Sequence, residues 1–230
     1  MSLISVFTDQ IRPDRGRRYE AIIAELAAEA RKKREEWRWT AHQVGFGSLA
    51  RIYYVSEHPD YADLEKHGDA PALFERVLGD AKGRKLLDEA NECLVSNQRT
   101  LGVQRLDLSY VKEPAQGVAP FASLALFRAR PGGQHLVEEL LRQIAEAIPK
   151  CGEPGSIAAA QAVIGDMLGY WTVRPLQKLA DLDRQSVGRA LLIKAFGKQE
   201  GERIFRSGLE GVDRLEREIT VYRADLSNPR

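Results

Sequence analysis

The chain of 230 residues repeats itself, because residues 3–109 align with residues 121–227 at a constant shift of 118 positions and without a gap. Identical residues fall in blocks, among them Arg12-Pro13 with Arg130-Pro131, Gln43 with Gln161, Ala62-Asp63-Leu64 with Ala180-Asp181-Leu182, and Asp107-Leu108-Ser109 with Asp225-Leu226-Ser227. A fixed internal period indicates repeated structural units. We therefore expect two domains of common size: repeat 1 over residues 1–111, a linker over 112–120, and repeat 2 over 121–230.

Composition and charge narrow the functions that are open to the chain. Apolar residues make up 43% and charged residues 29%, and the net charge is +1 with acids and bases interspersed. No basic patch predicts nucleic-acid binding, and no apolar run approaches the roughly 20 residues that cross a bilayer. The two cysteines, Cys93 and Cys151, occupy non-equivalent positions in the repeats, which favours a reducing compartment. The sequence predicts a cytoplasmic protein, monomer or homodimer, without nucleic-acid or membrane partners.

Each repeat predicts the order β-α-β-β-α-β. Apolar runs bounded by turn residues predict strands, and apolar residues with a 3.6-residue period predict helices. In repeat 1 the expected strands are Leu3–Ile11, about Trp37–Phe46, Leu49–Val55 and Leu101–Ser109, and the expected helices are Tyr19–Ala30 and about Ala70–Gln98, the second broken near Gly79 and Gly83. This order is the ferredoxin-like motif.

Alternation along the first strand assigns its two faces. Even positions such as Ile4 and Val6 are uniformly apolar and are expected to meet the helices. The other face carries Phe7, with Trp39 and Tyr53 on the neighbouring strands, and would stay open to water in a single unit. We therefore expect the two open faces to pack on each other. The predicted fold class is α+β, a tandem duplication of a ferredoxin-like unit that forms one pseudo-twofold α/β barrel.

The pattern resembles the dimeric α/β-barrel superfamily, and within it the NIPSNAP-like and antibiotic-biosynthesis-monooxygenase-like domains. The resemblance rests on the strand order, on Arg12-Pro13 before the first helix, on Ala62-Asp63-Leu64 after the third strand, and on aromatic third strands at Ile52-Tyr53-Tyr54 and Tyr170-Trp171-Thr172. It implies the barrel fold, with both halves in a single chain. Members include cofactor-free oxygenases, haem enzymes and isomerases, so the resemblance assigns no catalytic residue.

The candidate ligand-pocket residues are those that could face a space between the two sheets. Gln43 and Gln161 could hydrogen-bond a ligand's carbonyl or hydroxyl group, or satisfy a turn as structural amides. Arg105 and Arg223 either form same-face ion pairs with Asp107 and Asp225 or hold an anionic group at the barrel mouth. The further candidates for this pocket are Arg51, Tyr53 and Trp171, which could equally be core filler.

Histidines and acids give two weaker candidates. His42 has no counterpart, since Ala160 replaces it, and it could act as a base or be a hydrogen-bonded structural residue. After the third strand come possible metal ligands at His58, Asp60, Asp63, Glu65, His67 and Asp69. Their spacing fits no metal motif, so we expect a solvated acidic loop and no metal site.

Two functions remain open. In the first, the space between the sheets binds a small apolar or aromatic molecule, with cofactor-free oxidation or isomerisation as the accompanying chemistry. In the second, the barrel is filled and serves as a non-catalytic oligomerisation or regulatory module. No signature requires a cofactor, so none is expected, although haem and flavin stay open.

Overall fold

The computed structural model of the protein describes residues 2–112 and 117–229, so residues 113–116 of the expected linker lie outside the described part. Contacts within the chain define two compact units. Unit 1 consists of Met1–Gly102 with Val221–Arg230, and unit 2 of Val103–Thr220. Each unit is therefore completed by the last segment of the other sequence repeat.

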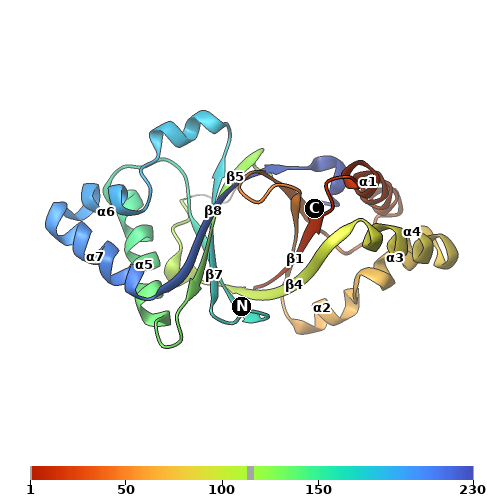
Figure 1. Ribbon diagram of the computed structural model, residues 1–230, viewed down its shortest axis with the longest axis horizontal. Helices are drawn as coiled ribbons and strands as arrows, with labels where there is room; N and C mark the ends of the chain where they lie inside the picture. The colour runs from red at the N-terminus through yellow and green to blue at the C-terminus, as the bar shows by residue number, and fades with distance from the viewer. Residues whose placement is uncertain (1, 113–116, 230) are drawn as a thin grey trace. The chain divides into compact units, whose positions relative to one another are not determined.

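Unit 1 is a sheet with helices on one face. In Figure 1, helices α1, α3 and α4 lie together beside β1 and β4. Its elements are β1 (Leu3–Ile11), α1 (Gly16–Lys33), β2 (Thr40–Phe46), β3 (Arg51–His58), α2 (Tyr61–His67), α3 (Ala70–Leu78), α4 (Asp80–Glu92), most of β4 (Leu94–Gln104), and the C-terminal 3-10 turn η3 (Ala224–Leu226).

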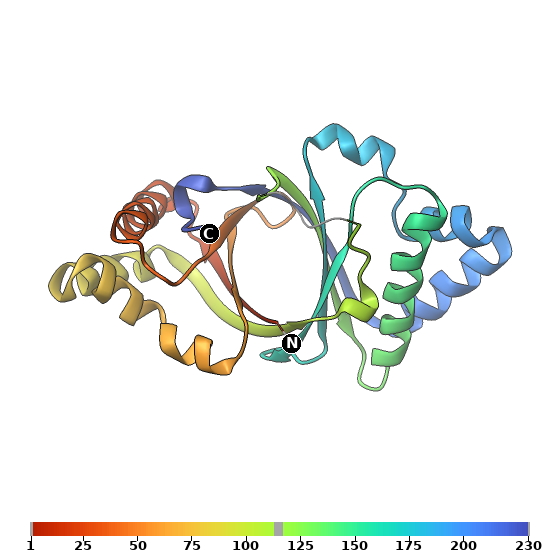
Figure 2. The same ribbon diagram turned by 180° about the vertical axis from the view of Figure 1, so that it is seen from behind.

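Unit 2 has the same plan. Figure 2 shows its green and blue helices, α5 and α7, side by side. Its elements are the 3-10 turn η1 (Leu106–Leu108), β5 (Phe121–Ala129), α5 (Gln134–Lys150), β6 (Ala158–Ile164), β7 (Gly169–Leu176), the 3-10 turn η2 (Leu179–Arg184), α6 (Gly188–Phe196), α7 (Lys198–Glu210) and most of β8 (Val212–Tyr222). Each element of repeat 2 begins 118 residues after its counterpart in repeat 1.

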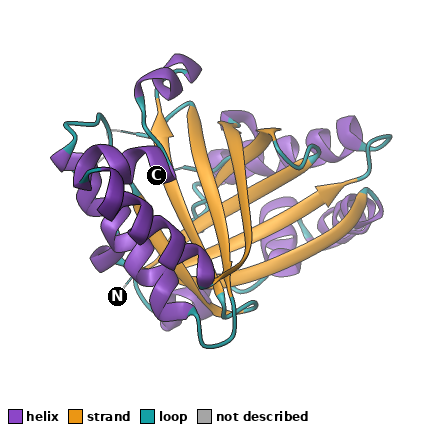
Figure 3. Ribbon diagram, turned by 60° about the vertical axis from the view of Figure 1, so that its left-hand side comes forward, coloured by secondary structure: helices purple, strands orange, loops and turns teal. Residues whose placement is uncertain are grey.

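The strand order confirms the predicted fold class. In hydrogen-bonding order the strands are β1-β3-β2-β8-β5-β7-β6-β4, and this order closes as a barrel. Within unit 1, β3 pairs antiparallel with both β1 and β2, so that Tyr54 lies opposite Phe7 on one side and Ala41 on the other. Helices and strands form separate layers (Figure 3).

The core of each unit lies between its sheet and its helices. In unit 1 the side chains of Tyr19, Ile22 and Leu26 from α1 pack in one cluster with Phe7 and Trp39. The expected face assignment was wrong for Phe7 and Trp39, because this face meets the helices. In unit 2 the corresponding residues Ala125 and Ile157 also belong to the helix-covered core. A one-residue error in parity exchanges the two faces of a strand.

Three local expectations differ from the structure. Strand β4 begins at Leu94, earlier than expected, because its first half contains the polar run Ser96–Arg99 and shows no apolar alternation. It ends at Gln104, and the following residues form η1 instead of continuing the strand. The expected loop after β3 contains helix α2, whose first turn is capped by the Asp60 side chain accepting from the Asp63 backbone N–H.

A glycine fixes how closely two helices of unit 1 approach. The expected break occurs at Gly79, which has a φ of 86° and separates α3 from α4. A Cβ atom placed on Gly83 in α4 would lie 2.6 Å from the backbone oxygen of Phe74 in α3. Backbone cannot move aside as a flexible side chain can, so α4 approaches α3 this closely only with glycine at this position.

We therefore expect Gly83→Ala to lower the free energy of unfolding by about 1–3 kcal/mol, the usual effect of overpacking. Gly16→Ala is the matched control, because a Cβ there meets nothing within 4 Å. Urea denaturation of both variants measures the difference. Equal stabilities would show that α3 and α4 separate without cost.

Candidate functional site

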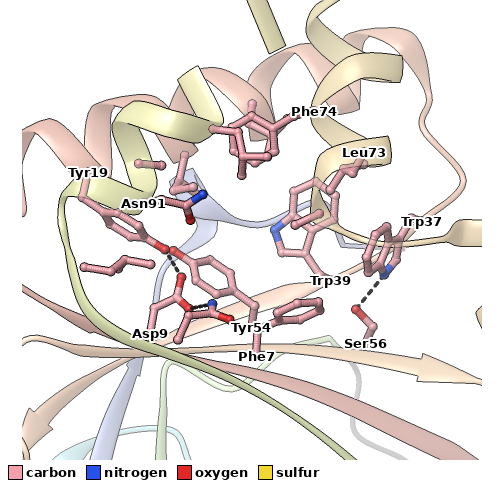
Figure 4. A pocket seen from close by; sticks show the side chains of 17 residues that line it. Phe7, Asp9, Tyr19, Trp37, Trp39, Tyr54, Ser56, Leu73, Phe74 and Asn91 are labelled. Carbon is pink, nitrogen blue, oxygen red and sulfur yellow. Dashed lines mark hydrogen bonds between the residues drawn. The ribbon is translucent and has the colours of Figure 1, made fainter. Parts of the chain in front are cut away.

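Unit 1 contains a cavity between its sheet and its helices. The cavity has a volume of about 110 Å³ and is lined mainly by apolar and aromatic side chains. Figure 4 shows Trp39, Leu73 and Phe74 around its middle. The lining residues come from β1, β3, α1, α3, α4 and the start of β4, together with Trp37 and Trp39 from the segment that leads into β2. The polar lining residues are Asp9, Tyr19, Tyr54, Ser56, Asn91 and Asn97.

One end of the cavity holds a buried carboxylate. Asp9 is 6% exposed and accepts hydrogen bonds from the Tyr19 hydroxyl and the Asn97 side-chain amide. Burial raises the pKa of Asp9 above its ordinary value, while the two hydrogen bonds act in the opposite direction. Asn91 and Asn97 are themselves exposed, so this polar end of the cavity lies next to solvent.

Tyr54 brings a second hydroxyl to the same end. Its ring points toward Tyr19 and Asp9 (Figure 4), and burial raises its pKa well above the ordinary tyrosine value. The hydroxyl lies beside that of Tyr19 but makes no hydrogen bond of ordinary geometry, and it is buried. The Tyr19 hydroxyl is its one polar neighbour, and a buried hydroxyl with so little hydrogen bonding is uncommon.

At the opposite end of the cavity the indole N–H of Trp37 donates to the Ser56 hydroxyl at 2.9 Å. This bond fixes the edge of the Trp37 ring (Figure 4). The cavity therefore offers hydrogen-bonding groups at one end and a rigid aromatic wall at the other. Such a site suits a planar apolar molecule with a polar group at one end.

The equivalent positions of unit 2 have lost this chemistry. At the same shift of 118, Phe127 stands for Asp9, Val137 for Tyr19 and Thr172 for Tyr54. Phe127 and Val137 are both buried in the core of unit 2. Burying a carboxylate costs free energy that burying an apolar side chain does not. The polar cavity is therefore a property of unit 1 that its fold does not require.

The first pair of predicted residues, Gln43 and Arg223, lies in a network on the helix side of unit 1. Arg223 donates to the Gln43 side-chain oxygen, to Glu20 of α1 at 3.0 Å and to Asp225 at 2.7 Å. The ion pair with Asp225 agrees with the simpler of the two interpretations of Arg223. These contacts raise the pKa of the guanidinium, the Asp225 hydrogen bond being the largest cause.

The second pair, Gln161 and Arg105, forms the matching network in unit 2. Arg105 donates to Gln161 at 2.6 Å, to Glu138 of α5 at 2.9 Å and to Asp107 at 2.7 Å. Tyr170 extends this network, because its hydroxyl donates to Glu138 at 2.9 Å and accepts from Gln161. Both glutamines are thus engaged by an arginine that comes from the other sequence repeat.

The other candidates lie on the strands. Arg51 donates to the Tyr53 hydroxyl at 3.2 Å, and Tyr53 is paired in register with His42. His42 contacts the Thr40 hydroxyl at 3.0 Å and packs on the Tyr222 ring at 5.8 Å. Trp171, on β7, is half-buried opposite Ala160 and Leu126. None of these four candidate side chains lines the cavity of unit 1.

Several site residues were missed by the reasoning from sequence. Glu20 and Glu138 occupy equivalent positions of the two repeats, and this identity could have marked both residues as candidates. Asp9 was noted only as a member of a mixed strand face. A better signal for the cavity is the difference in polarity between the repeats. Repeat 1 has Asp9 and Tyr19 where repeat 2 has Phe127 and Val137, and such a difference indicates that the two positions have different roles.

The whole chain is similar in fold to several solved structures. An anthrone oxidase-like protein matches with a TM-score of 0.62 and 11% identity over 100% of this chain and 94% of that one. A protein titled as a putative monooxygenase from Fusobacterium nucleatum subsp. nucleatum matches with a TM-score of 0.60 and 10% identity, over 96% and 92%. A chlorite dismutase variant from Candidatus Nitrospira defluvii gives 0.57 and 12%, over 97% and 92%. The likeness is one of fold.

Comparisons by sequence add no relative. No family model matches the chain, and no curated protein matches it. None of the helices in the described part of the chain combines the length and apolarity that crossing a bilayer needs.

The environment of His42 predicts a dependence of stability on pH. Burial lowers the pKa of His42 to about 4, against 6.5 in an unfolded chain. Between these values the unfolded chain binds more protons, so the free energy of unfolding falls as pH falls from about 6.5 to 4. His42→Gln should remove up to about 3 kcal/mol of this loss. Urea denaturation at pH 7 and pH 4.5 measures the free energy of unfolding of both proteins. His135→Gln, which removes an exposed histidine, is the control. The same pH dependence in wild type and in His42→Gln would contradict the burial argument.

Proposed function

We propose that unit 1 binds a small planar aromatic compound with an acidic O–H or C–H group, and that dioxygen oxidises the bound compound without a cofactor. The observation that supports this most is the Asp9 carboxylate, buried at the end of an aromatic cavity and held by Tyr19 and Asn97. The cavity, at about 110 Å³, is somewhat smaller than the roughly 150 Å³ apolar cavity that takes up benzene. A single ring therefore matches its size better than a polycyclic compound.

The chemistry follows from the polar end. A base is most effective when its pKa approaches the working pH, and burial moves the pKa of Asp9 in that direction. Asp9 would remove a proton from the substrate, and the resulting electron-rich anion would react with dioxygen. Each turnover consumes one O₂ and releases one water. At a CH₂ group both hydrogens leave and the C–H₂ becomes C=O; at a phenol the O–H hydrogen and the para C–H hydrogen leave and the product is the para-quinone. The unpartnered Tyr54 hydroxyl would donate to the oxygen on which charge develops.

The names of the structural neighbours support an oxidation over other chemistry. Two of them are a putative monooxygenase and an anthrone oxidase-like protein. An isomerase would use the same proton removal and return the proton elsewhere on the substrate without consuming dioxygen. Binding without reaction is the third possibility. The pocket between the two sheets, with Gln43, Arg51, Tyr53, Gln161 and Trp171 as its lining, stays a prediction.

Tyr54→Phe separates a ligand site from a packing defect. In the ligand-free protein the variant loses a buried hydroxyl whose one polar neighbour is the Tyr19 hydroxyl, so the free energy of unfolding should stay within about 1 kcal/mol of wild type. Affinity for phenolic probes should fall about tenfold, the equivalent of one lost hydrogen bond. Quenching of the Trp37 and Trp39 fluorescence by a panel of phenols and naphthols measures affinity. Tyr170→Phe, which removes a buried hydroxyl from unit 2, is the matched control.

Asp9→Asn tests the reaction itself. We expect dioxygen consumption with the tightest-binding probe to fall by about 10²–10⁴-fold, the usual contribution of a general base, while affinity changes by less than tenfold. An oxygen electrode and product mass spectrometry provide the readout. Turnover that survives in Asp9→Asn would eliminate Asp9 as the base. Binding without any turnover in wild type would reduce the proposal to a binding protein.

A further inference from the structure

A second cluster of reactive side chains lies outside the cavity. The structure brings together His58 at the end of β3 with Asp63 and His67 of α2. The His58 Nδ1 atom lies 2.9 Å from one Asp63 oxygen, and the His67 Nε2 atom lies 3.5 Å from the other. One ligand atom from each of the three residues can be chosen so that all lie within 4.8 Å of one another.

The chain builds this cluster through helix α2. The Asp60 side chain caps the helix, which places Asp63 and His67 one turn apart on the same face. His58 precedes the helix on β3 and is 1% exposed. Reasoning from sequence discarded these residues because it expected a loop here, where their spacing has no fixed geometry.

The ligand set has a definite chemical preference. Two imidazoles and one carboxylate are the donors that Zn²⁺ and similar transition-metal ions take, whereas Mg²⁺ and Ca²⁺ prefer oxygen alone. Ligands about 2.0–2.1 Å from a tetrahedral zinc ion lie roughly 3.3–3.5 Å apart. The distances of 2.9 and 3.5 Å from Asp63 to the two histidines are close to this separation. The Asp63 side chain is 29% exposed, which leaves a side open for a water ligand.

A simpler interpretation is that Asp63 only bridges two histidines by hydrogen bonds. A hydrogen-bonded bridge explains the two Asp63 contacts, and it leaves the buried His58 Nε2 atom without a partner just as a metal bound through Nδ1 would. The case for a metal therefore rests on the convergence of the three ligand atoms within 4.8 Å. The neighbouring positive charges do not oppose a cation strongly, because Lys66 is paired with Glu36 at 2.5 Å and Arg76 with Glu35 at 3.2 Å.

Repeat 2 lacks the cluster at the equivalent place. Leu176 replaces His58 and Gln185 replaces His67, while the retained aspartate, Asp181, accepts from backbone N–H groups at the start of η2. The retained aspartate therefore makes different contacts in the two repeats, with backbone N–H groups in repeat 2 and with two histidines in repeat 1. The two histidines are an addition specific to repeat 1.

We propose that His58, Asp63 and His67 bind one divalent transition-metal ion of the Zn²⁺ class. Bound metal would tie α2 to β3. It would also hold the His67 ring, which stacks on Trp37 with centroids 6.0 Å apart, and through it one wall of the cavity. The site does not depend on the function proposed for the cavity.

The experiment is calorimetric titration of chelator-treated full-length protein with Zn²⁺ alone, followed by Co²⁺ titration monitored by visible absorption. Wild type should bind one ion per chain and give the intense Co²⁺ bands of four-coordinate nitrogen and oxygen ligation. His67→Gln and Asp63→Asn should each weaken binding by about 100-fold or more, since losing even an outer-shell partner typically costs 10–100-fold. His135→Gln, which removes an exposed histidine, and Cys151→Ser, which removes a free thiol, should bind as wild type does.

Two results would overturn the proposal: no stoichiometric binding by wild type, or unchanged affinity in His67→Gln and Asp63→Asn. Far-UV circular dichroism identifies a variant that does not fold. Asp63→Asn keeps the size and the hydrogen-bonding capacity of a partly exposed side chain, so we expect this variant to fold. If the variants of the buried histidines do not fold, the Zn²⁺ affinity of Asp63→Asn alone tests the proposal.

Discussion

The C-terminal segment from Val221 onward is the element on which the site of unit 1 depends. Arg223 anchors it by pairing with Glu20 and Gln43, and Leu226 is fully buried. The Trp39 indole N–H donates to the Leu226 carbonyl at 2.8 Å, and the Asn228 amide donates to the Trp37 carbonyl at 2.7 Å. Both tryptophans line the cavity. A segment from the end of repeat 2 thus positions the aromatic wall of a site built otherwise from repeat 1.

The difference between the two units is best explained by the energetics of Asp9. An unpaired buried carboxylate is very unfavourable, and even a paired one gives little net stability. Unit 1 keeps Asp9 together with Tyr19 and Asn97, whereas unit 2 has an apolar side chain at each corresponding position. Unit 2 shows that the fold forms without the polar group. Retention of a costly group in one copy is what a functional site produces, since such sites give up stability for chemistry.

Sequence alone predicted the architecture because the repeat acts as an internal check: strands Leu3–Ile11 and Phe121–Ala129 were predicted with the bounds that the structure has. The strand faces were assigned wrongly, because the mixed face of the first strand was expected to meet the other sheet, whereas Ser5 and Asp9 on this face bond to Arg99 of β4 and Tyr19 of α1. Such partners are set by tertiary packing. The cluster at His58 was missed for the same reason, since its geometry exists only once α2 forms.

Trp37 connects the C-terminal segment, the cavity and the cluster at His58, all of which lie in unit 1. Its carbonyl is held by Asn228, its indole N–H is fixed on Ser56, and its ring stacks on His67. One ring therefore bounds the cavity and supports a histidine of the cluster. Because Trp37 is already held at its carbonyl and its indole N–H, coupling between a cation at His67 and a ligand in the cavity would act through the position of this ring.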